Sequence, residues 1–231
     1  MIEYFLEQGS TYAASVDGLV NLIGALVGFW FLASLGAFLY LIFRFRKKGN
    51  SKAQYVTGYE KHESRWVHWP HHLILVCDVF IVIGAVQVWI DVKQTLPEEP
   101  RAERVRIISQ QWAWTFVHAG PDGKLDTADD IPMIDELHVE VNKPYIYELS
   151  SLDVLHDFSV PIFRLKQDAV PGRVITGWFE PTITGEYDIQ CAEICGIGHG
   201  LMPGRIFIES PQKHAAWQAQ QAPTTLAATT Q

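Results

Sequence analysis

Two long apolar segments dominate the first part of the chain. Residues 18–43 form 26 consecutive positions without a charged side chain, and residues 70–91 form a second apolar stretch interrupted by a few polar residues. A helix needs about 20 residues to cross a bilayer. The pattern therefore predicts two membrane-spanning helices joined in a hairpin.

Beyond residue 100 the pattern changes to short segments in which apolar and polar positions alternate. Residues 104–118 alternate in this way with two tryptophans, as a strand does, and Gly120-Pro121-Asp122-Gly123 is a strong turn signal. Similar short strand patterns follow at 137–141, 145–149, 174–179, 185–190 and 204–208. Many short strands separated by Gly and Pro predict a β-sandwich or barrel.

The patterns divide the chain into three parts. Residues 1–94 contain the N-terminal segment and the helical hairpin, residues 95–210 form the β-rich domain, and residues 211–231 form a polar tail. The tail is rich in Gln, Ala and Thr, a composition typical of flexible segments. The chain starts Met1-Ile2-Glu3 without a basic region, so a cleaved signal peptide is not indicated.

Charge predicts the orientation of the hairpin. The loop between the two apolar segments carries the basic residues Arg44, Arg46, Lys47, Lys48, Lys52, Lys61 and Arg65. Loops rich in Lys and Arg stay on the cytoplasmic side. Both termini and the β-rich domain are therefore expected on the outer side of the membrane.

The β-rich domain is acidic. From Thr95 onward the chain has 19 acidic and 10 basic residues, a balance that argues against nucleic acid and suits a basic protein partner attracted over a distance. Ordinary solubility explains the same balance. Four aspartates gather between Gly120 and Asp130 and could surround a calcium ion. Their spacing does not match the EF-hand pattern, and a solvated acidic hairpin loop is the favoured interpretation.

The chemically most distinctive segment lies between Cys191 and Met202. Its spacing, C-x3-C-x3-H-x2-M, places two thiols, the imidazole of His199 and a thioether within twelve residues. Such soft and borderline donors favour copper in its lower oxidation state, and two cysteines on one loop could share a pair of metal ions. A disulfide between Cys191 and Cys195 is the alternative, but it gives no reason for the spacing to His199 and Met202.

Each of two coppers would need its own imidazole, and His156 is the best second candidate. It lies at a strand end just before a proline, where a side chain can face a loop site. His118 precedes a Gly-Pro turn, His138 alternates with apolar neighbours, and His214 lies in the polar tail. For any single histidine an ordinary hydrogen-bonded role is the simpler interpretation. At His199 the neighbouring Cys and Met residues make a metal-binding role the favoured one.

Four sequence blocks occur in the order of a known family. They are QWAW at residues 111–114, DVLH at 153–156, KQDAVPGR at 166–173 and QCAEICGIGHGLMP at 190–203. With the two apolar segments they extend over nearly the whole chain, which resembles subunit II of the haem-copper oxidases, the cytochrome c oxidase subunit 2 family that carries a binuclear CuA centre. The last block is very specific, whereas the tryptophan pair alone is weak. The resemblance implies a two-helix transmembrane hairpin followed by an all-β cupredoxin-like Greek-key barrel.

The resemblance also implies a ligand set for the two copper ions. Its members are the bridging Cys191 and Cys195, the capping His156 and His199, and two weak ligands, Met202 and the main-chain carbonyl of Glu193. The side chain of Glu193 is implied to bind a magnesium ion at the boundary with the catalytic subunit. Asp153 is a candidate for orienting a histidine ring.

Residues for electron and proton transfer are implied as well. Trp112 and Trp114 match the aromatic patch that receives electrons from cytochrome c, although Ala113 stands where family members usually have Tyr. Core packing is the alternative for both tryptophans. Glu63, just before the second apolar segment, resembles the acidic residue at the cytoplasmic mouth of a proton pathway, and an exposed loop glutamate is the simpler interpretation.

The resemblance implies that the chain is the electron-accepting subunit of a cytochrome-c-type terminal oxidase, which is an oxidoreductase and translocase. It also implies a location in the bacterial inner membrane, with the β-rich domain in the periplasm. Its partners are then the haem-bearing catalytic subunit I, other oxidase subunits, membrane lipid and cytochrome c or another small redox donor. A CuA-containing nitric oxide reductase uses the same scaffold. A copper-free docking subunit and a copper chaperone are alternatives of other classes. The complete set of Cys, His and Met ligands argues against a copper-free docking subunit. A copper chaperone would leave the two helices and the 166–173 block unexplained.

Overall fold

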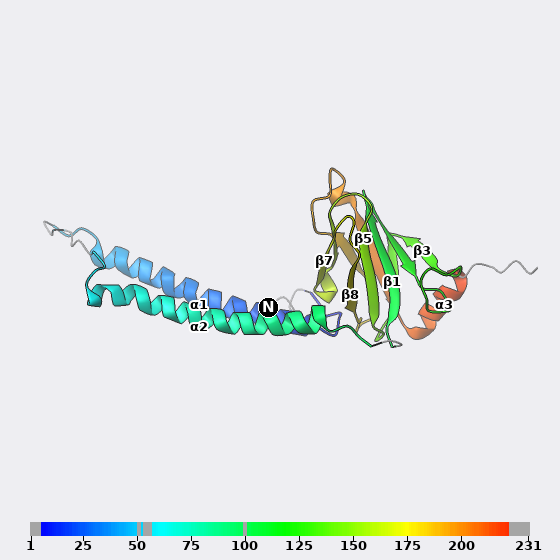
Figure 1. Cartoon of the computed structure of the whole chain (residues 1–231). Coiled ribbons are helices and arrows are strands. Elements are labelled where there is room, and N and C mark those ends of the chain that lie inside the picture. The colour runs from blue at the N-terminus through cyan, green and yellow to red at the C-terminus, as the bar shows by residue number, and fades with distance from the viewer. Residues whose placement is uncertain (1–5, 50–51, 53–56, 99–100, 222–231) are drawn as a thin grey trace, which may run out of the picture. The chain divides into compact units, whose positions relative to one another are not determined.

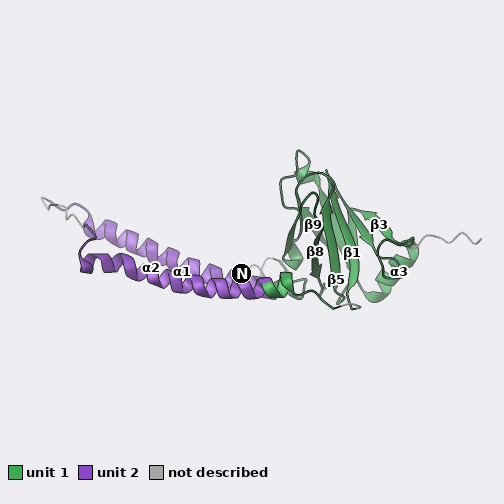
Figure 2. Cartoon of the chain, viewed as in Figure 1, with its two compact units in different colours: residues 1–14, 90–231 green, residues 15–89 purple. Residues whose placement is uncertain are grey.

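The chain folds into two compact units, which are described separately. The computed structural model describes residues 6–49, 52, 57–98 and 101–221 (Figure 1). One unit comprises residues 15–89, and the other comprises residues 6–14 together with the chain from residue 90 onward (Figure 2).

Unit 2, the helical hairpin (residues 15–89), is built from two long apolar helices, α1 (Ala13–Phe45) and α2 (Lys61–Trp89). Both are long and apolar enough to cross a membrane. Large apolar side chains such as Phe31 and Phe80 are exposed on them, as expected of helices surrounded by lipid or another protein rather than water. The predicted pair of apolar helices is confirmed. α1 extends beyond its predicted span at both ends, whereas α2 begins nine residues before residue 70 and ends at Trp89. After α2 the chain continues in a short π-helix, η2 (Ile90–Gln94).

Unit 1 is a cupredoxin-like sandwich of two five-stranded sheets, as predicted (Figure 1). One sheet has the order β3-β2-β1-β5-β8 and the other the order β4-β10-β9-β6-β7. β1 runs parallel to β5 and β4 runs parallel to β10, whereas the other neighbours are antiparallel. The strands are β1 (Glu103–Gln110), β2 (Ala113–His118), β3 (Ile131–Ile134), β4 (Glu136–Glu140), β5 (Tyr145–Ser151), β6 (His156–Val160), β7 (Leu165–Ala169), β8 (Ile175–Phe179), β9 (Gly185–Cys191) and β10 (Pro203–Glu209).

Alternation along the strands places one face of each sheet in the core. In β1, Val105 and Ile107 are buried while the positions between them are partly exposed, and Trp114 and Phe116 do the same in β2. Phe158 of β6 packs edge-on against Trp114, with ring centroids 5.6 Å apart. Each fully buried aromatic side chain contributes roughly 1.5–3 kcal/mol, so this core is a firm base for the loops at the strand ends.

The alternating segment 104–118 is a hairpin of two strands rather than one strand. Gln110 of β1 pairs with Ala113 of β2, which leaves Gln111 and Trp112 at the turn. Neither Gly nor Pro marks this turn. The alternating pattern runs through it without interruption and therefore predicted one continuous strand. β3 and β7 were not predicted because β3 contains a proline and β7 has three consecutive polar residues.

The predicted loose tail after residue 210 is wrong for its first part. Pro211 opens a helix, α3 (Pro211–Gln221), in a position that favours proline. His214 and Trp217 are buried, and Trp217 stacks on His138 of β4 with ring centroids 4.3 Å apart. The composition of the segment did not reveal this helix, because only two of its side chains, His214 and Trp217, are buried and the rest of the segment is mostly polar. The rest of the predicted tail, residues 222–231, lies outside the described residues.

The residues before α1 pack on the β-sandwich. Gly9 donates its N–H to the carbonyl of Ile162 and accepts the N–H of Thr182, both at 2.9 Å. Ser10 forms an isolated β-bridge with Pro181. The predicted grouping of residues 1–94 with the hairpin therefore differs from the structure at its N-terminal end.

The acidic segment after β2 forms the hairpin loop that leads to β3. The carboxylate of Asp126 pairs with Arg106 at 2.7 Å, and the hydrogen bond from Arg106 lowers the pKa of Asp126 below its ordinary value. Asp122 accepts the N–H of Lys124 at 2.8 Å, and Asp129 accepts the hydroxyl of Thr127 at 2.7 Å. Neighbouring donors thus engage these carboxylates, in keeping with a solvated hairpin loop.

Candidate metal centre

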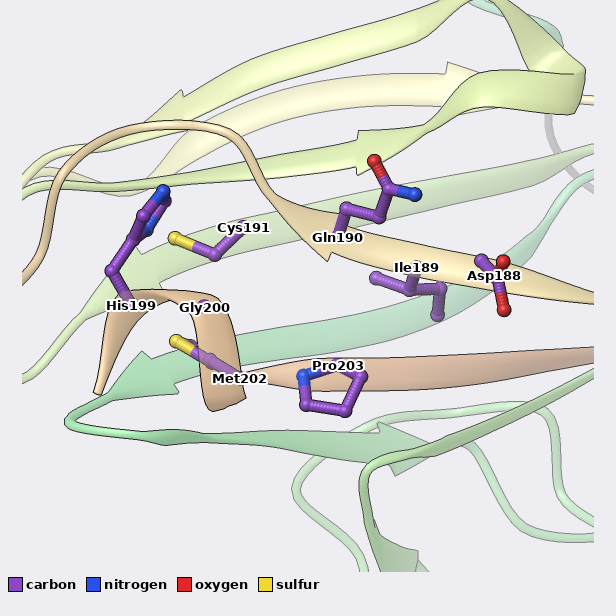
Figure 3. A pocket seen from close by; sticks show the side chains of 8 residues that line it. All are labelled: Asp188, Ile189, Gln190, Cys191, His199, Gly200, Met202 and Pro203. Carbon is purple, nitrogen blue, oxygen red and sulfur yellow. The ribbon is translucent and has the colours of Figure 1, made fainter.

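Five candidate donor side chains converge at one end of the sandwich. His156 begins β6 and Cys191 ends β9, and the pairing of these two strands brings the residues together. The loop between β9 and β10 carries Cys195, and His199 opens a short 3-10 turn, η4 (His199–Leu201). Met202 follows this turn. In Figure 3, Cys191, His199 and Met202 line a surface pocket of about 360 Å³.

The two thiol sulfurs lie side by side. Cys191 Sγ and Cys195 Sγ are 3.8 Å apart and both cysteines are free. A disulfide requires sulfurs about 2.05 Å apart, so the structure does not support the disulfide alternative. The donor atoms of His156, Cys191 and Cys195 lie within 4.8 Å of one another, which is close enough for one metal ion to reach all three.

The remaining donors are distributed evenly between the two sulfurs. His156 Nδ1 lies 3.9 Å from Cys191 Sγ, and His199 Nδ1 lies 3.7 Å from Cys195 Sγ. The carbonyl oxygen of Glu193 is 3.3 Å from Cys191 Sγ. Met202 Sδ is 4.0 Å from Cys195 Sγ. Each thiol is thus accompanied by one imidazole nitrogen and one weaker donor.

This donor set fits copper. Thiolate, thioether and imidazole are the ligand types that copper prefers among the first-row metals. Cys195 and Met202 are almost fully buried and His156 is fully buried. Burial, followed by the neighbouring sulfur of Cys191, raises the pKa of the Cys195 thiol to about 11. A bound cation favours the deprotonated thiolate and so couples metal binding to proton release.

Asp153 holds the ring of His156 in place. Its Oδ1 lies 2.8 Å from Nε2 of His156, so the other ring nitrogen, Nδ1, is free to face the sulfurs. Burial alone would raise the pKa of Asp153, but hydrogen bonds from His156 and from the main-chain N–H groups of Gln111 and Val154 outweigh it and lower that pKa. The side chain therefore remains a carboxylate, the common partner of a metal-binding histidine.

The two tryptophans of the QWAW block have different environments. Trp112, at the β1–β2 turn, is 38% exposed, whereas Trp114 is fully buried against Phe158. A Cβ added at Gly198 would lie 2.8 Å from Cε2 of Trp112, and one added at Gly196 would lie 3.3 Å from its Cζ2. The indole of Trp112 therefore rests directly on the loop between Cys195 and His199.

Glu63 lies in the other compact unit, in the first turn of α2. Its carboxylate accepts the N–H of Gly58 at 2.9 Å and the hydroxyl of Thr57 at 3.3 Å. These bonds order the chain where the helix begins. The structure thus gives Glu63 a local structural role beside the one that the sequence predicted.

Gln111 is a contact of the centre that sequence reasoning missed. Its side-chain Nε2 donates a hydrogen bond to the main-chain carbonyl of Cys195 at 2.7 Å. The residue sat inside an apparently continuous strand, where a glutamine is an ordinary exposed side chain. Only the β1–β2 turn, which carried no turn signal, brings it to the metal-binding loop.

The comparisons with known proteins point to one family. The family model for the periplasmic domain of cytochrome c oxidase subunit II matches residues 104–210. The alternative cytochrome c oxidase subunit 2 of Bradyrhizobium diazoefficiens is 34% identical over 228 residues, covering 89% of this chain and 80% of the relative. Cytochrome c oxidase subunit 2 of Cereibacter sphaeroides is 29% identical over 213 residues, covering 79% of this chain and 68% of the relative. Among solved structures, the periplasmic domain of subunit II of cytochrome oxidase of Bradyrhizobium japonicum matches with 27% identity and a TM-score of 0.48, covering 55% of this chain and 96% of that one.

Proposed function

The chain belongs to the cytochrome c oxidase subunit II family, and we propose that it accepts electrons at a binuclear CuA centre on behalf of a respiratory haem-copper oxidase. Its relatives are subunits of an oxidoreductase complex. The two apolar helices and the periplasmic-domain match fit a membrane protein whose β-sandwich lies outside. We place it in the inner membrane of a bacterium, beside the haem-bearing subunit I that reduces oxygen and the other subunits of a proton-translocating oxidase.

One observation carries the proposal. The sulfurs of Cys191 and Cys195 lie 3.8 Å apart, and each has its own imidazole nitrogen and its own weak donor. A site for a single copper would need one such set, whereas two matched sets around a shared pair of sulfurs suit two ions. When bound, the copper pair supplies a one-electron carrier. The convergence of all these donors also counts against a copper-free docking subunit.

The protein side chains hold and tune this centre. The two cysteines would bridge the ions, His156 and His199 would each bind one of them, and the weak donors would adjust the reduction potential. These weak donors are Met202 and the Glu193 carbonyl. Burial keeps water away from His156, Cys195 and Met202, and Asp153 fixes the ring of His156. A site held this firmly needs little rearrangement when its charge changes.

Trp112 is the proposed contact for the electron donor, which is cytochrome c or a similar small redox protein. It is partly exposed and touches the loop between Cys195 and His199, and Ile197 on the same loop is 96% exposed. Trp114 lies in the core, where packing explains its position. Two further roles rest on family membership: the Glu193 carboxylate as a magnesium ligand at the boundary with subunit I, and Glu63 as the entrance of a proton pathway.

The proposed function is tested by mixing the copper-loaded full chain with reduced cytochrome c in a stopped-flow instrument. We expect rapid reduction of the protein, and a Trp112→Leu variant should be reduced at least tenfold more slowly while keeping its copper. Trp66→Leu, which removes an exposed tryptophan from the other compact unit, is the matched control. Equal rates in the Trp112 variant and the parent would show that electrons do not enter there.

A further inference from the structure

We infer, on the premise of the proposed copper site, that Gln111 is a positioning residue that connects the two loops that position the proposed copper ligands. One of these loops, residues 152–155, precedes His156. The other, residues 192–202, contains Cys195, His199 and Met202. Gln111 sits between them on the β1–β2 turn and bonds to both.

The bonds of Gln111 run in two directions. Its side-chain Nε2 donates to the carbonyl oxygen of Cys195 at 2.7 Å. Its main-chain N–H donates to Oδ2 of Asp153, also at 2.7 Å. The other carboxylate oxygen of Asp153 lies 2.8 Å from Nε2 of His156. A short chain of hydrogen bonds therefore connects His156, which follows one loop, to Cys195 on the other.

The metal-binding loop is shaped to receive this contact. Gly196 has φ of +126°, which only glycine adopts readily. A Cβ at this position would lie 2.8 Å from Nε2 of Gln111. The lack of a side chain at Gly196 therefore lets the amide of Gln111 approach the Cys195 carbonyl. Trp112 covers the same loop one step further along, against Gly198.

The turn that carries Gln111 is itself anchored to the sandwich. β1 and β2 pair along their whole length up to Gln110 and Ala113. The carbonyl of Ser109 accepts the N–H of Leu152 at 3.0 Å, and the hydroxyl of Ser109 donates to the carbonyl of Ser150 at 3.1 Å. The hairpin thus holds the start of the 152–155 loop as well. Gln111 extends from this fixed hairpin toward a loop in which η4 is the regular element.

The consequence is control over the direction of the Cys195 side chain. The carbonyl of Cys195 belongs to the peptide unit that joins it to Gly196. The Cα atom of Cys195 is part of the same planar unit, so a hydrogen bond to this oxygen restrains the backbone atom that carries the thiol side chain. Ligands must be held within about 0.5 Å of their working geometry. Losing a hydrogen bond that orients a ligand weakens metal binding. The loss of one neutral hydrogen bond corresponds to a decrease of roughly two- to tenfold in metal affinity.

The test compares Gln111→Met with Gln110→Met in the full chain. Methionine keeps the length of the side chain but cannot donate, and Gln110 is an exposed neighbour that takes no part in the hydrogen bonds to Cys195 and Asp153 described above. In metal-free protein we expect faster amide hydrogen exchange across residues 195–199 in the Gln111 variant only. In copper-loaded protein we expect copper to dissociate two- to tenfold more readily and the reduction potential to shift.

A second variant guards against a folding defect. Gln111→Glu has nearly the same shape but turns an acceptor toward the Cys195 carbonyl, so it should accelerate exchange in the loop at least as much as the methionine variant. Near-ultraviolet circular dichroism confirms that each variant keeps the packed core. Parental exchange and parental copper affinity in both Gln111 variants would overturn the assignment.

The outcomes separate this role from the proposed function. If the parent protein failed to bind two coppers, the proposed function would fail, but faster loop exchange in the metal-free Gln111 variants would still support the positioning role. If the parent bound two coppers and both Gln111 variants matched it in exchange and in potential, the proposed function would stand and the role of Gln111 would be refuted.

Discussion

Acid should destabilise the β-sandwich through His118, which is not one of the proposed metal ligands. The side chain of His118 is buried at the end of β2, edge-on to Trp217 with ring centroids 4.9 Å apart. Burial is the largest cause of a lowered pKa, followed by the charges that His138 and His214 can carry, and together they bring the pKa of His118 from 6.5 to about 3. The folded protein therefore holds this ring neutral.

The sign of the effect follows from where the proton binds. Between pH 6.5 and about 3 the unfolded chain protonates His118 and the folded chain does not, so protons favour unfolding. The contribution of His118 to stability is complete above pH 6.5 and is lost as the pH falls toward 3. At about 1.4 kcal/mol per pH unit, lowering the pH to 5 costs about 2 kcal/mol of unfolding free energy.

The assay is guanidinium unfolding of the full chain in detergent, followed by near-ultraviolet circular dichroism at pH 7.5 and pH 5. His118→Phe keeps an aromatic ring and removes the titrating group, so its unfolding free energy should fall by about 2 kcal/mol less than that of the parent over this interval. His62→Phe, exposed on the other compact unit, should behave like the parent. Groups that do not interact with His118 titrate alike in parent and variant and cancel in the comparison.

An equal loss of stability in the parent and in His118→Phe would refute the burial argument. A second experiment, hydrogen exchange at the same two pH values, reports on α3. His138 and His214 share the stack around Trp217, and His138 has a lowered pKa for which burial is again the largest cause. Protonation of His138 should loosen α3 before the sandwich unfolds, which hydrogen exchange of residues 211–221 would detect.

Three further predictions concern the metal centre. Met202→Leu keeps the buried volume and should retain copper with a shifted reduction potential, measured by copper quantitation and redox titration; loss of the metal would contradict a weak-ligand role. Asp153→Asn removes the charge that accepts three hydrogen bonds and should weaken copper binding roughly 10- to 100-fold, whereas an unchanged dissociation constant would remove Asp153 from the site. Gly198→Ala should displace the indole of Trp112 and slow reduction by cytochrome c; the matched control is Gly200→Ala, whose added Cβ would meet no atom within 4 Å, and equal rates would contradict the contact.

Local spacing explains why most of the site could be predicted from the sequence. Cys191, Cys195, His199 and Met202 lie within one loop, so their grouping needs no knowledge of the fold. His156 is distant in the chain and came from its position before a proline and from the family blocks. The structure brings it to the loop through the pairing of β6 with β9.

The parts that sequence reasoning missed depend on contacts between distant segments. Gln111 reaches Cys195 only because β1 and β2 form a hairpin whose turn lacks Gly or Pro. Trp217 anchors α3 through a stack on His138 that no periodic pattern in a short polar segment reveals. Likewise, residues 6–12 add to the sandwich through main-chain hydrogen bonds, which carry no side-chain pattern.

The most direct test of the central claim is electron paramagnetic resonance of the copper-loaded full chain, combined with copper quantitation. Two coppers that share the sulfurs of Cys191 and Cys195 should give one unpaired electron spread equally over both metal nuclei, with two coppers per chain. A Cys195→Ser variant should lose that pattern. A single localised copper, one copper per chain, or an unchanged spectrum in the Cys195 variant would contradict the binuclear centre proposed for these ligands.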